Sequence, residues 1–220
     1  MLKKIFVFLL PWPLRRRALN SWFGFKIHPT ARIGFAWVFP KELIMKENAL
    51  ISHLTVAIHL DKIEMDENSI IGHSNWITGF PSGTASKHFQ HQPDRKSILF
   101  MGKHSAITKH HHIDCTNIIT IGQFATVAGY YSQILTHSVN VFENIQDSNP
   151  ITIGDYTFVG TNSVILGGAV LPAHCVLGAK SLLNKAFTEE WKLYAGSPAT
   201  AIQDMPKEAK YFSRIDGYVF

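Results

Sequence analysis

An aliphatic residue recurs at every sixth position of the stretch 151–183, which reads ITIGDYTFVGTNSVILGGAVLPAHCVLGAKSLL. The aliphatic positions are Ile153, Val159, Ile165, Leu171, Leu177 and Leu183. A small residue follows each of the first five by four positions, at Thr157, Ser163, Ala169, Cys175 and Ser181. A period of six fits neither the 3.6-residue period of an α-helix nor the alternation of an ordinary strand. It is typical of a parallel β-helix, whose short strands lie on three flat faces with about eighteen residues per coil.

Each position of the repeat has a predicted place in such a prism. The aliphatic residue points inward, and the small residue fits where the corner is tight. Glycines that follow the aliphatic position, as at Gly154, Gly160 and Gly178, are predicted to take the unusual backbone angles of the turn. We therefore expect an all-β chain built as a parallel β-helix, with an N-terminal helical segment, projecting loops and a short C-terminal helix.

The repeat extends toward the N-terminus and is interrupted twice. It begins near Ile27, and Asn48 and Asn68 fall at predicted corners, where a left-handed backbone is tolerated. The interruptions cover residues 78–97 and 135–150, which are polar and lack the aliphatic period. Excursions of this length from a compact repeat are usually functional or disordered. We interpret the first as a loop that projects from a corner and helps to shape a substrate cleft.

Positive charge is concentrated in residues 1–26, which contain six basic residues and no acidic one. The rest of the chain is close to neutral, so a nucleic-acid-binding body is not expected. The apolar run 5–10 is far too short to span a bilayer. Two compatible interpretations remain. The segment lies at a membrane surface, with its aromatic rings among headgroups and Arg15–Arg17 on anionic phosphate, or it caps the open end of the prism.

Three units are expected along the chain: the basic-aromatic segment 1–26, a β-helix domain 27–203 and a tail 204–220. Pro206 is a suitable first residue for a short helix through Ser213. The two cysteines, Cys115 and Cys175, do not make a disulfide framework. They are expected to be structural thiols of a reducing compartment. The expected location is the cytoplasm, either free or peripheral at the inner face of the membrane.

Three sequence elements carry a resemblance to a known family: the repeats, the THS triplet 136–138, and GAKSLLNK (178–185) followed by YAGSPA (194–199). They resemble the hexapeptide-repeat acyltransferases, which are left-handed parallel β-helices, and in particular the acetyl-CoA-dependent sugar O-acetyltransferases of the maltose/galactoside and polysaccharide-biosynthesis type. The left hand comes from this resemblance, since the period alone does not reveal it. The resemblance also implies a homotrimer with each active site between neighbouring subunits, and acetyl-CoA as the acyl donor.

His137 lies at the start of the second interruption, in the sequence ILTHSVN. In the acetyltransferases that the chain resembles, a histidine in this setting is the catalytic base. Acyl transfer from a thioester to a hydroxyl needs a base that works near neutral pH and returns the proton to the leaving thiolate. A backbone N–H of an adjacent coil would serve the oxyanion. The resemblance thus assigns the base to His137.

The resemblance places acceptor-binding polar groups about one coil before His137, in the segment HHHIDCT. It implies an acceptor-side role for Asp114 and His110. An alternative for Asp114 is that its carboxylate only caps a turn. The acceptor is expected to be a sugar, a nucleotide sugar or a glycolipid.

The resemblance also implies a donor groove along the last coils. Gly160 and Thr161 correspond to pantetheine contacts, Ala179 to a backbone contact, and Asn184 and Lys185 to the polar end that meets the nucleotide. A lysine near phosphate is chemically suitable. Repeat geometry alone also accounts for Gly160 and Ala179, so that interpretation stays open.

Other functions of the same fold remain as alternatives. The γ-class carbonic anhydrases bind zinc through three histidines, and 144–147 (NIQD) is superficially like one of their motifs. The following coil supplies no histidine and His174 is isolated, so we predict no metal. The further alternatives are N-acetylation of an amino sugar and a non-catalytic β-helix scaffold.

Overall fold

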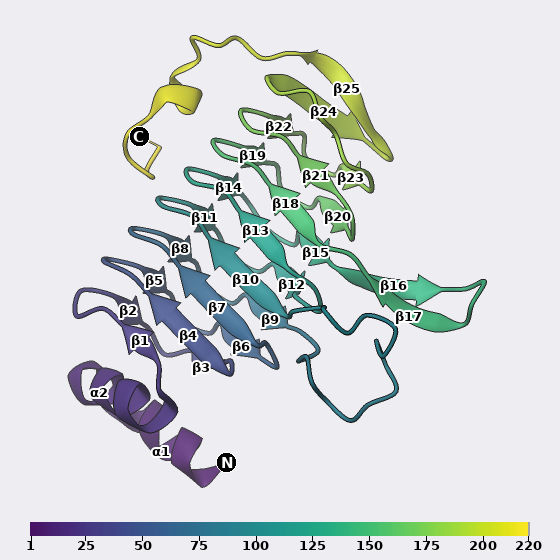
Figure 1. Cartoon of the computed structure of the whole chain (residues 1–220). Coiled ribbons are helices and arrows are strands. Elements are labelled where there is room, and N and C mark those ends of the chain that lie inside the picture. The colour runs from purple at the N-terminus through teal and green to yellow at the C-terminus, as the bar shows by residue number, and fades with distance from the viewer. Residues whose placement is uncertain (220) are drawn as a thin grey trace.

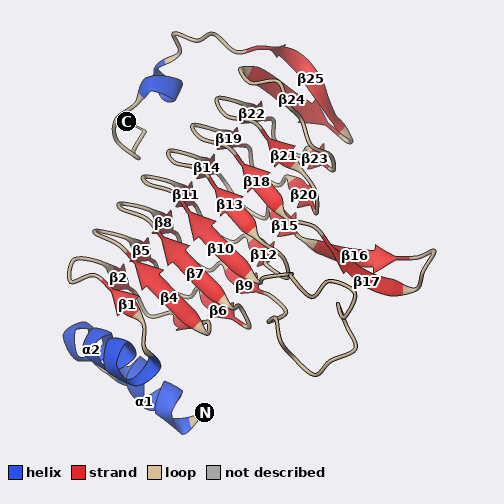
Figure 2. Cartoon of the chain, viewed as in Figure 1, coloured by secondary structure: helices blue, strands red, loops and turns tan. Residues whose placement is uncertain are grey.

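The chain winds as a left-handed parallel β-helix whose successive strands fall in rotation on three sheets, with two helices at one end of the prism (Figures 1 and 2). The structure is a computed structural model and describes residues 1–219. Neighbouring strands in the three sheets are parallel and come from successive coils, except at the C-terminal end of one sheet, where the last pair is antiparallel. The fold class predicted from the period of six is confirmed.

The three sheets are named A, B and C in the order in which the chain visits them. Sheet A contains β1 (Lys26–Ile27), β4 (Glu42–Met45), β7 (Lys62–Met65), β10 (Ile98–Met101), β13 (Ile119–Ile121), β18 (Ile151–Ile153) and β21 (Val170–Leu171). Sheet B contains β2 (Arg32–Ile33), β5 (Leu50–Ile51), β8 (Ile70–Ile71), β11 (Ala106–Ile107), β14 (Thr126–Val127), β19 (Phe158–Val159), β22 (Val176–Leu177), β24 (Lys192–Gly196) and β25 (Ala199–Asp204). Sheet C contains β3 (Trp37–Phe39), β6 (Val56–Ile58), β9 (Trp76–Thr78), β12 (His112–Asp114), β15 (Gln133–Leu135), β20 (Val164–Leu166) and β23 (Leu182–Leu183).

The core of the prism is a column of the repeat's aliphatic and small residues. All six aliphatic positions from Ile153 to Leu183 are fully buried, and the five small residues between them are at most 2% exposed. The same arrangement continues toward the N-terminus, where Met45, Met65 and Met101 are buried on sheet A. Burial of one or two side chains per strand supplies most of the stability of such a stack.

The length of a coil varies along the prism. Thr152 pairs with Val170 in the last coils, a step of 18 residues, whereas Glu42 pairs with Lys62 in an early coil, a step of 20. The early coils therefore contain longer corners than the 18-residue coil that the period of six predicts. The strand register is the same in both regions, since each aliphatic position still lies over the one before it.

The glycines of the repeat do not adopt the backbone angles predicted for them. The left-handed angles belong instead to residues such as Tyr156 and Asn162, with φ of 54° and 57°, and to Asn48 and Asn68 as expected. Glycine is required by close packing between coils. A Cβ on Gly160 would lie 2.6 Å from the backbone N of Ala179, in the next coil, a distance that real Cβ atoms do not reach.

Two helices, α1 (Leu2–Leu9) and α2 (Trp12–Phe23), cover the N-terminal end of the prism (Figure 1). Val7 and Leu19 are fully buried in the same hydrophobic cluster as the first coils. Arg15 is buried too, and its guanidinium donates to the carbonyl oxygens of Gly34 (2.8 Å) and Ala36 (2.6 Å). The expectation that Arg15 contacts lipid phosphate is therefore wrong, because two backbone carbonyls of the first coils bind it.

No helix within residues 1–219 combines the length and the apolar composition needed to cross a bilayer.

The C-terminal end departs from the repeat. β24 continues sheet B in parallel with β22, and β25 returns antiparallel to β24. The helix predicted from Pro206 to Ser213 is only a 3₁₀ turn, η1 (Lys210–Ser213). The reason is that Pro206 opens a separate turn, in which its carbonyl accepts a hydrogen bond from the Ala209 N–H. The tail then lies along the corner between sheets A and B, where the Tyr211 hydroxyl donates to the Thr157 carbonyl (2.9 Å).

Both interruptions of the repeat leave the prism at the corner between sheets C and A, here called the C–A corner. The first is a loop of residues 79–97 without helix or strand. The second contains an antiparallel hairpin of β16 (His137–Asn140) and β17 (Ile145–Ser148). Figure 2 shows the loop and the hairpin side by side on one edge of the prism. This edge is also where His137 lies.

Candidate active site

Asp114 ends strand β12 at the C–A corner, and its carboxylate is buried and fully occupied. One oxygen, Oδ1, accepts hydrogen bonds from the backbone N–H and the hydroxyl of Thr116 (3.2 and 2.7 Å). The other, Oδ2, accepts from the backbone N–H of His137 (3.3 Å) and the hydroxyl of Thr136 (3.3 Å). The residue is only 6% exposed. A buried carboxylate with this many donors is stabilised as an anion.

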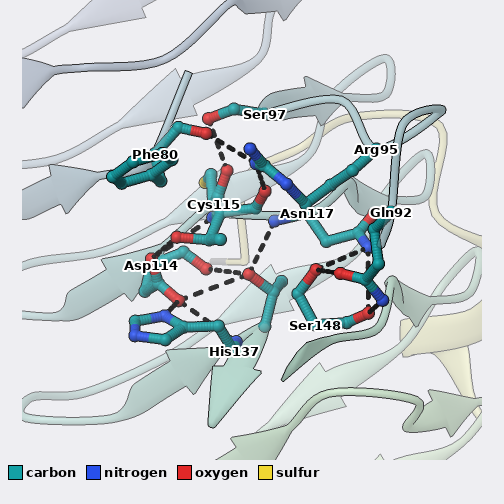
Figure 3. A network of polar contacts seen from close by, with 11 residues as sticks. Phe80, Gln92, Arg95, Ser97, Asp114, Cys115, Asn117, His137 and Ser148 are labelled. Atoms are coloured by element: carbon teal, nitrogen blue, oxygen red, sulfur yellow. Dashed lines mark hydrogen bonds and ion pairs between the residues drawn. The ribbon is translucent and has the colours of Figure 1, made fainter. Parts of the chain in front are cut away.

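His137 lies directly beside this carboxylate because β12 pairs with β15 in register, which places Asp114 opposite Leu135. The imidazole Nδ1 is 2.5 Å from Asp114 Oδ2. The side chain is 41% exposed, and Nε2 has no hydrogen-bond partner among residues 1–219. Figure 3 shows the ring next to Asp114 at the edge of the polar network. With Nδ1 as the donor to the carboxylate, the free lone pair is on Nε2.

The pair shifts both pKa values in the directions expected for a charge-assisted hydrogen bond. The hydrogen bond with Asp114 raises the pKa of His137, against a smaller opposing effect of burial and of the Arg95 charge. Burial alone would raise the pKa of Asp114, but the hydrogen bonds from His137 and Thr116 outweigh it and lower that pKa. Asp114 is therefore ionised at neutral pH, and His137 is a stronger base than a free imidazole.

The loop 79–97 packs against His137 through Phe89. The two rings are perpendicular, with centroids 6.2 Å apart. The Arg95 guanidinium lies over the Phe89 ring at 4.5 Å and donates to the carbonyl of Phe80 (2.6 Å) and to that of Thr116. Arg95 is 8% exposed. This buried arginine thus holds the loop against the end of β12, next to the histidine.

A second set of contacts joins the loop to the hairpin. Gln92 Nε2 donates to Asp147 Oδ1 (2.7 Å) and to the Ser148 carbonyl (2.8 Å), and the Ser148 hydroxyl donates to Gln92 Oε1 (2.7 Å). Asn117 Nδ2, from the turn after β12, donates to the Ser148 hydroxyl (3.1 Å). Figure 3 shows Gln92, Asn117 and Ser148 in this network. The two insertions and the corner therefore form one connected unit.

A cavity of about 440 Å³ lies between the loop and the hairpin. Phe89 lines it on the loop side, together with Lys87 and His91, and Val139 and Ile145 line it on the hairpin side. Phe89 links this cavity to the catalytic candidate, since it lines the cavity and its ring contacts that of His137, which is not itself a lining residue. That the first interruption helps to shape a substrate cleft stays a prediction. This cavity is the candidate for that cleft.

His110 does not join this group. It lies at the opposite end of β12, at the corner between sheets B and C, with a left-handed backbone (φ 58°). Its ring stacks near Tyr130 at 6.0 Å. The neighbouring His111 is buried, which lowers its pKa to about 4, and it accepts a hydrogen bond from the Ser132 N–H. The buried His111 ring therefore has a structural role in this corner.

The residues assigned to the donor side divide between two corners. Gly160, Thr161 and Ala179 lie at the corner between sheets B and C, and Asn184 and Lys185 follow β23 at the C–A corner. The Thr161 hydroxyl accepts from the Tyr130 N–H (2.9 Å) and donates to the Tyr130 carbonyl (3.0 Å). Their roles in donor binding stay predictions.

Phe89, Gln92 and Arg95 are functional candidates that sequence reasoning missed. They lie in a segment without periodicity, so no pattern fixed their direction or their partners. Thr116 and Thr136 were missed for a different reason. The Thr136 hydroxyl contacts Asp114 only because two coils stack in a particular register, whereas Thr116 contacts it locally, in the turn that the Asp114 carboxylate caps. Among residues 1–219 no group of three or more His, Cys, Asp or Glu side chains is arranged to hold a metal ion.

Searches with the sequence alone give no relative: no family model matches it, and no curated protein does. Comparison of structures does find similar proteins. The polysialic acid O-acetyltransferase OatWY aligns over 85% of this chain and 90% of its own, with a TM-score of 0.55 and 15% identity. This is the hexapeptide-repeat acyltransferase fold.

Other proteins of this fold align over similar lengths. A hexapeptide-repeat acetyltransferase from Vibrio cholerae, solved with acetyl coenzyme A, covers 93% of this chain and 84% of its own (TM-score 0.49, 18% identity). A hexapeptide transferase family protein from Anaplasma phagocytophilum covers 86% and 89% (TM-score 0.48, 19% identity). At these identities the similarity concerns the hexapeptide-repeat fold.

Proposed function

We propose that the protein is an acetyl-CoA-dependent O-acetyltransferase that acts on a sugar hydroxyl, with His137 as general base and Asp114 as its positioning residue. The observation that carries the proposal is the 2.5 Å contact between His137 Nδ1 and a buried, anionic carboxylate. Because Nδ1 is engaged, the lone pair on Nε2 is free to accept a proton. The ring is partly exposed and lies beside the two long insertions. A base held by a carboxylate is the arrangement that nucleophile activation requires.

In the first step the Nε2 lone pair of His137 accepts the proton of the acceptor hydroxyl. The hydroxyl oxygen then attacks the thioester carbonyl carbon and forms a C–O bond. Asp114 stabilises the imidazolium that results, because its carboxylate stays ionised and accepts the Nδ1–H throughout. Both Asp114 oxygens are engaged within the chain, so we assign Asp114 to this positioning role in preference to acceptor contact.

In the second step the tetrahedral intermediate collapses. The C–S bond breaks, and the imidazolium returns its proton to the departing thiolate, which leaves neutral His137, the O-acetyl ester and free coenzyme A. The oxyanion of the intermediate needs a hydrogen-bond donor, and a backbone N–H of an adjacent coil is the group we assign to it.

The acceptor is proposed to be a sugar of a surface polysaccharide, a glycolipid or a nucleotide sugar. Support comes from OatWY, the structural neighbour with a TM-score of 0.55, which is named for polysialic acid. The cavity between loop and hairpin adds support, since its lining combines an aromatic ring with cationic and polar groups. Such mixed linings suit ligands with both apolar and hydroxyl faces.

We further propose that the working unit is a homotrimer. Within one chain the two groups of donor-side residues are separated by the strands of sheet C, which run from the B–C corner to the C–A corner. A site between neighbouring copies would bring Gly160, Thr161 and Ala179 of one copy to His137 and Lys185 of the next.

The first test measures thiol release from acetyl-CoA with a panel of sugars, amino sugars and nucleotide sugars, for wild type and His137→Ala. The proposal expects release with a hydroxyl acceptor and its loss in the variant. Release only with amino sugars would replace O-transfer by N-transfer. No release and no coenzyme A binding by calorimetry would favour a non-catalytic scaffold.

A mixing experiment tests the shared site. His137→Ala chains and Ala179→Glu chains, which alter opposite sides of the proposed interface, are each expected to be weakly active alone. Unfolded together and refolded as mixed trimers, they would recover activity, because some interfaces then contain both wild-type residues. Absence of recovery, with mixed trimers confirmed by mass, would place the whole site within one chain.

A further inference from the structure

Helix α1 leaves an apolar stripe uncovered. Its exposed large side chains are Leu2 (83%), Ile5 (41%), Phe6 (56%) and Leu9 (68%), which follow the i, i+3, i+4, i+7 spacing of one helical face. The opposite face is packed, since Val7 is fully buried and the ring centroids of Phe8 and Phe35 are 4.3 Å apart. The stripe is thus a surface that the fold presents outward, and α1 does not need it to pack against the prism.

Helix α2 extends this surface with an aromatic ring. Trp22 is 47% exposed and stacks with Phe6 at 6.0 Å. We call Leu2, Ile5, Phe6, Leu9 and Trp22 together the N-terminal apolar face. It lies at the end of the prism where the chain begins (Figure 1).

Cations accompany this face, and anions are absent from the segment. Lys3 is exposed, and its Nζ lies 5.5 Å from the centroid of the Trp22 ring. Arg17 and Lys26 are exposed as well. No acidic residue occurs between residues 1 and 26. Lys3 therefore places positive charge beside the apolar and aromatic side chains of the face, whereas Lys26 lies in a groove with Glu47 and Glu67.

We propose that the N-terminal apolar face binds the surface of a bilayer that contains anionic lipid. Apolar side chains along one face of a short helix, with an aromatic ring and lysines beside them, are the composition of interfacial helices. Positive charge complements the anionic headgroups. The occupant is a lipid surface, and this inference does not depend on the acetyl-transfer activity.

This placement would bring the active site close to the membrane. On sheet C, β3 is the strand nearest the helices, and β12, which carries Asp114, is three strands further along. Strands are about 4.8 Å apart, so Asp114 lies roughly 15 Å beyond the first strand of that sheet. Helix α1 adds about 10 Å between that strand and the bilayer, so an acceptor carried on a lipid would reach this corner if it extended roughly 25 Å from the membrane.

The test measures co-sedimentation of the full chain with vesicles of phosphatidylcholine alone and of phosphatidylcholine mixed with phosphatidylglycerol. Wild type is expected to bind the mixed vesicles, and added salt to weaken the binding. The double variant Leu2→Glu/Leu9→Glu is expected to lose at least about tenfold in partitioning. Lys3→Gln is expected to lose about fivefold on the mixed vesicles only.

Matched controls make the same kinds of substitution, apolar to Glu and Lys to Gln, elsewhere in the chain. Val141→Glu/Phe142→Glu alters two apolar residues at the hairpin tip that are 76% and 94% exposed, and Lys210→Gln removes a cation from the C-terminal tail. Both are expected to bind vesicles as wild type does. The secondary structure of each variant is checked by circular dichroism.

Three results would overturn the proposal. The first is wild type that binds neither kind of vesicle. The second is equal loss in the hairpin control, which would show non-specific adsorption of exposed apolar groups. The third is a change of assembly size in Leu2→Glu/Leu9→Glu while wild type does not bind vesicles, which would assign the face to contact between copies of the chain.

Discussion

Two corners of the prism show how differently the same coil can be used. At the corner between sheets A and B, aromatic side chains from five successive turns stack in one column: His104, Phe124, Tyr156, His174 and Trp191. Their ring centroids are 4.9, 4.7, 5.4 and 4.2 Å apart, and each residue has a left-handed φ. At the C–A corner, the loop 79–97 and the hairpin β16–β17 separate successive turns.

The comparison shows what an insertion does to a repeat. Where every coil closes with a turn of the same geometry, equivalent side chains lie over one another and add to stability. Where a coil is extended, side chains from distant segments meet, as Phe89 meets His137. The regular corner is thus expected to govern folding, and the interrupted corner to govern chemistry.

The largest expected effect is on the interrupted corner. His137→Ala should lower kcat/KM by about 10²–10⁴-fold, because the general base is lost. The free energy of unfolding should fall by only about 1–2 kcal/mol, because the ring is 41% exposed but the buried Asp114 carboxylate loses one hydrogen bond. Steady-state kinetics and chemical denaturation measure the two quantities. An unchanged rate would remove His137 from the mechanism.

Asp114→Asn should lower kcat/KM by about 10²-fold or more, because the carboxylate that orients the histidine and stabilises its imidazolium is lost. The pH profile provides the sharper readout. Because Asp114 raises the pKa of His137, the wild-type rate should rise with pH through a midpoint above 6.5, and the variant's midpoint should lie lower. A midpoint that does not move would contradict the positioning role.

A substitution in the aromatic column should lower the stability and leave the activity unchanged. Phe124→Ala removes a ring that is 7% exposed and stacked on both sides, and should cost about 3 kcal/mol of unfolding free energy. The activity below the unfolding transition should match wild type. Phe142→Ala, at a 94% exposed position, is the control and should stay within about 0.5 kcal/mol.

The smallest expected effect concerns the connection between loop and hairpin. Gln92→Ala removes three hydrogen bonds to Asp147 and Ser148, which should raise the acceptor KM by about fivefold, equivalent to about 1 kcal/mol. The melting temperature should be nearly unchanged. Glu143→Ala at the hairpin tip is the matched control. An equal KM for both variants would show that the network does not order the cavity.

The fold was predictable from the sequence because the hexapeptide period reports directly on which side chains point inward. Ile153 and its equivalents were assigned correctly for that reason, and the corners at Asn48 and Asn68 followed. The role of glycine was not predictable, since the close approach of Gly160 to Ala179 depends on the distance between coils. Sequence shows the position of a glycine and not its neighbours in space.

The site was predictable only in part. The setting of His137 marked it as a candidate, and Asp114 was named without its partner. The pairing depends on the register of β12 with β15, which no local pattern encodes. Arg95 and Phe89 have no period that orients them, so only tertiary packing shows that they lie against the histidine.

The two covered ends of the prism also bear on how the chain avoids polymerising. A stack of parallel strands ends in rows of unpaired N–H and C=O groups, which can template another copy. At the first coil, Arg15 occupies the carbonyls of Gly34 and Ala36. At the last, β25 runs antiparallel along β24, so a further parallel coil has no matching edge on sheet B. The terminal segments therefore set the length of an architecture that, repeated without them, would grow into a fibre.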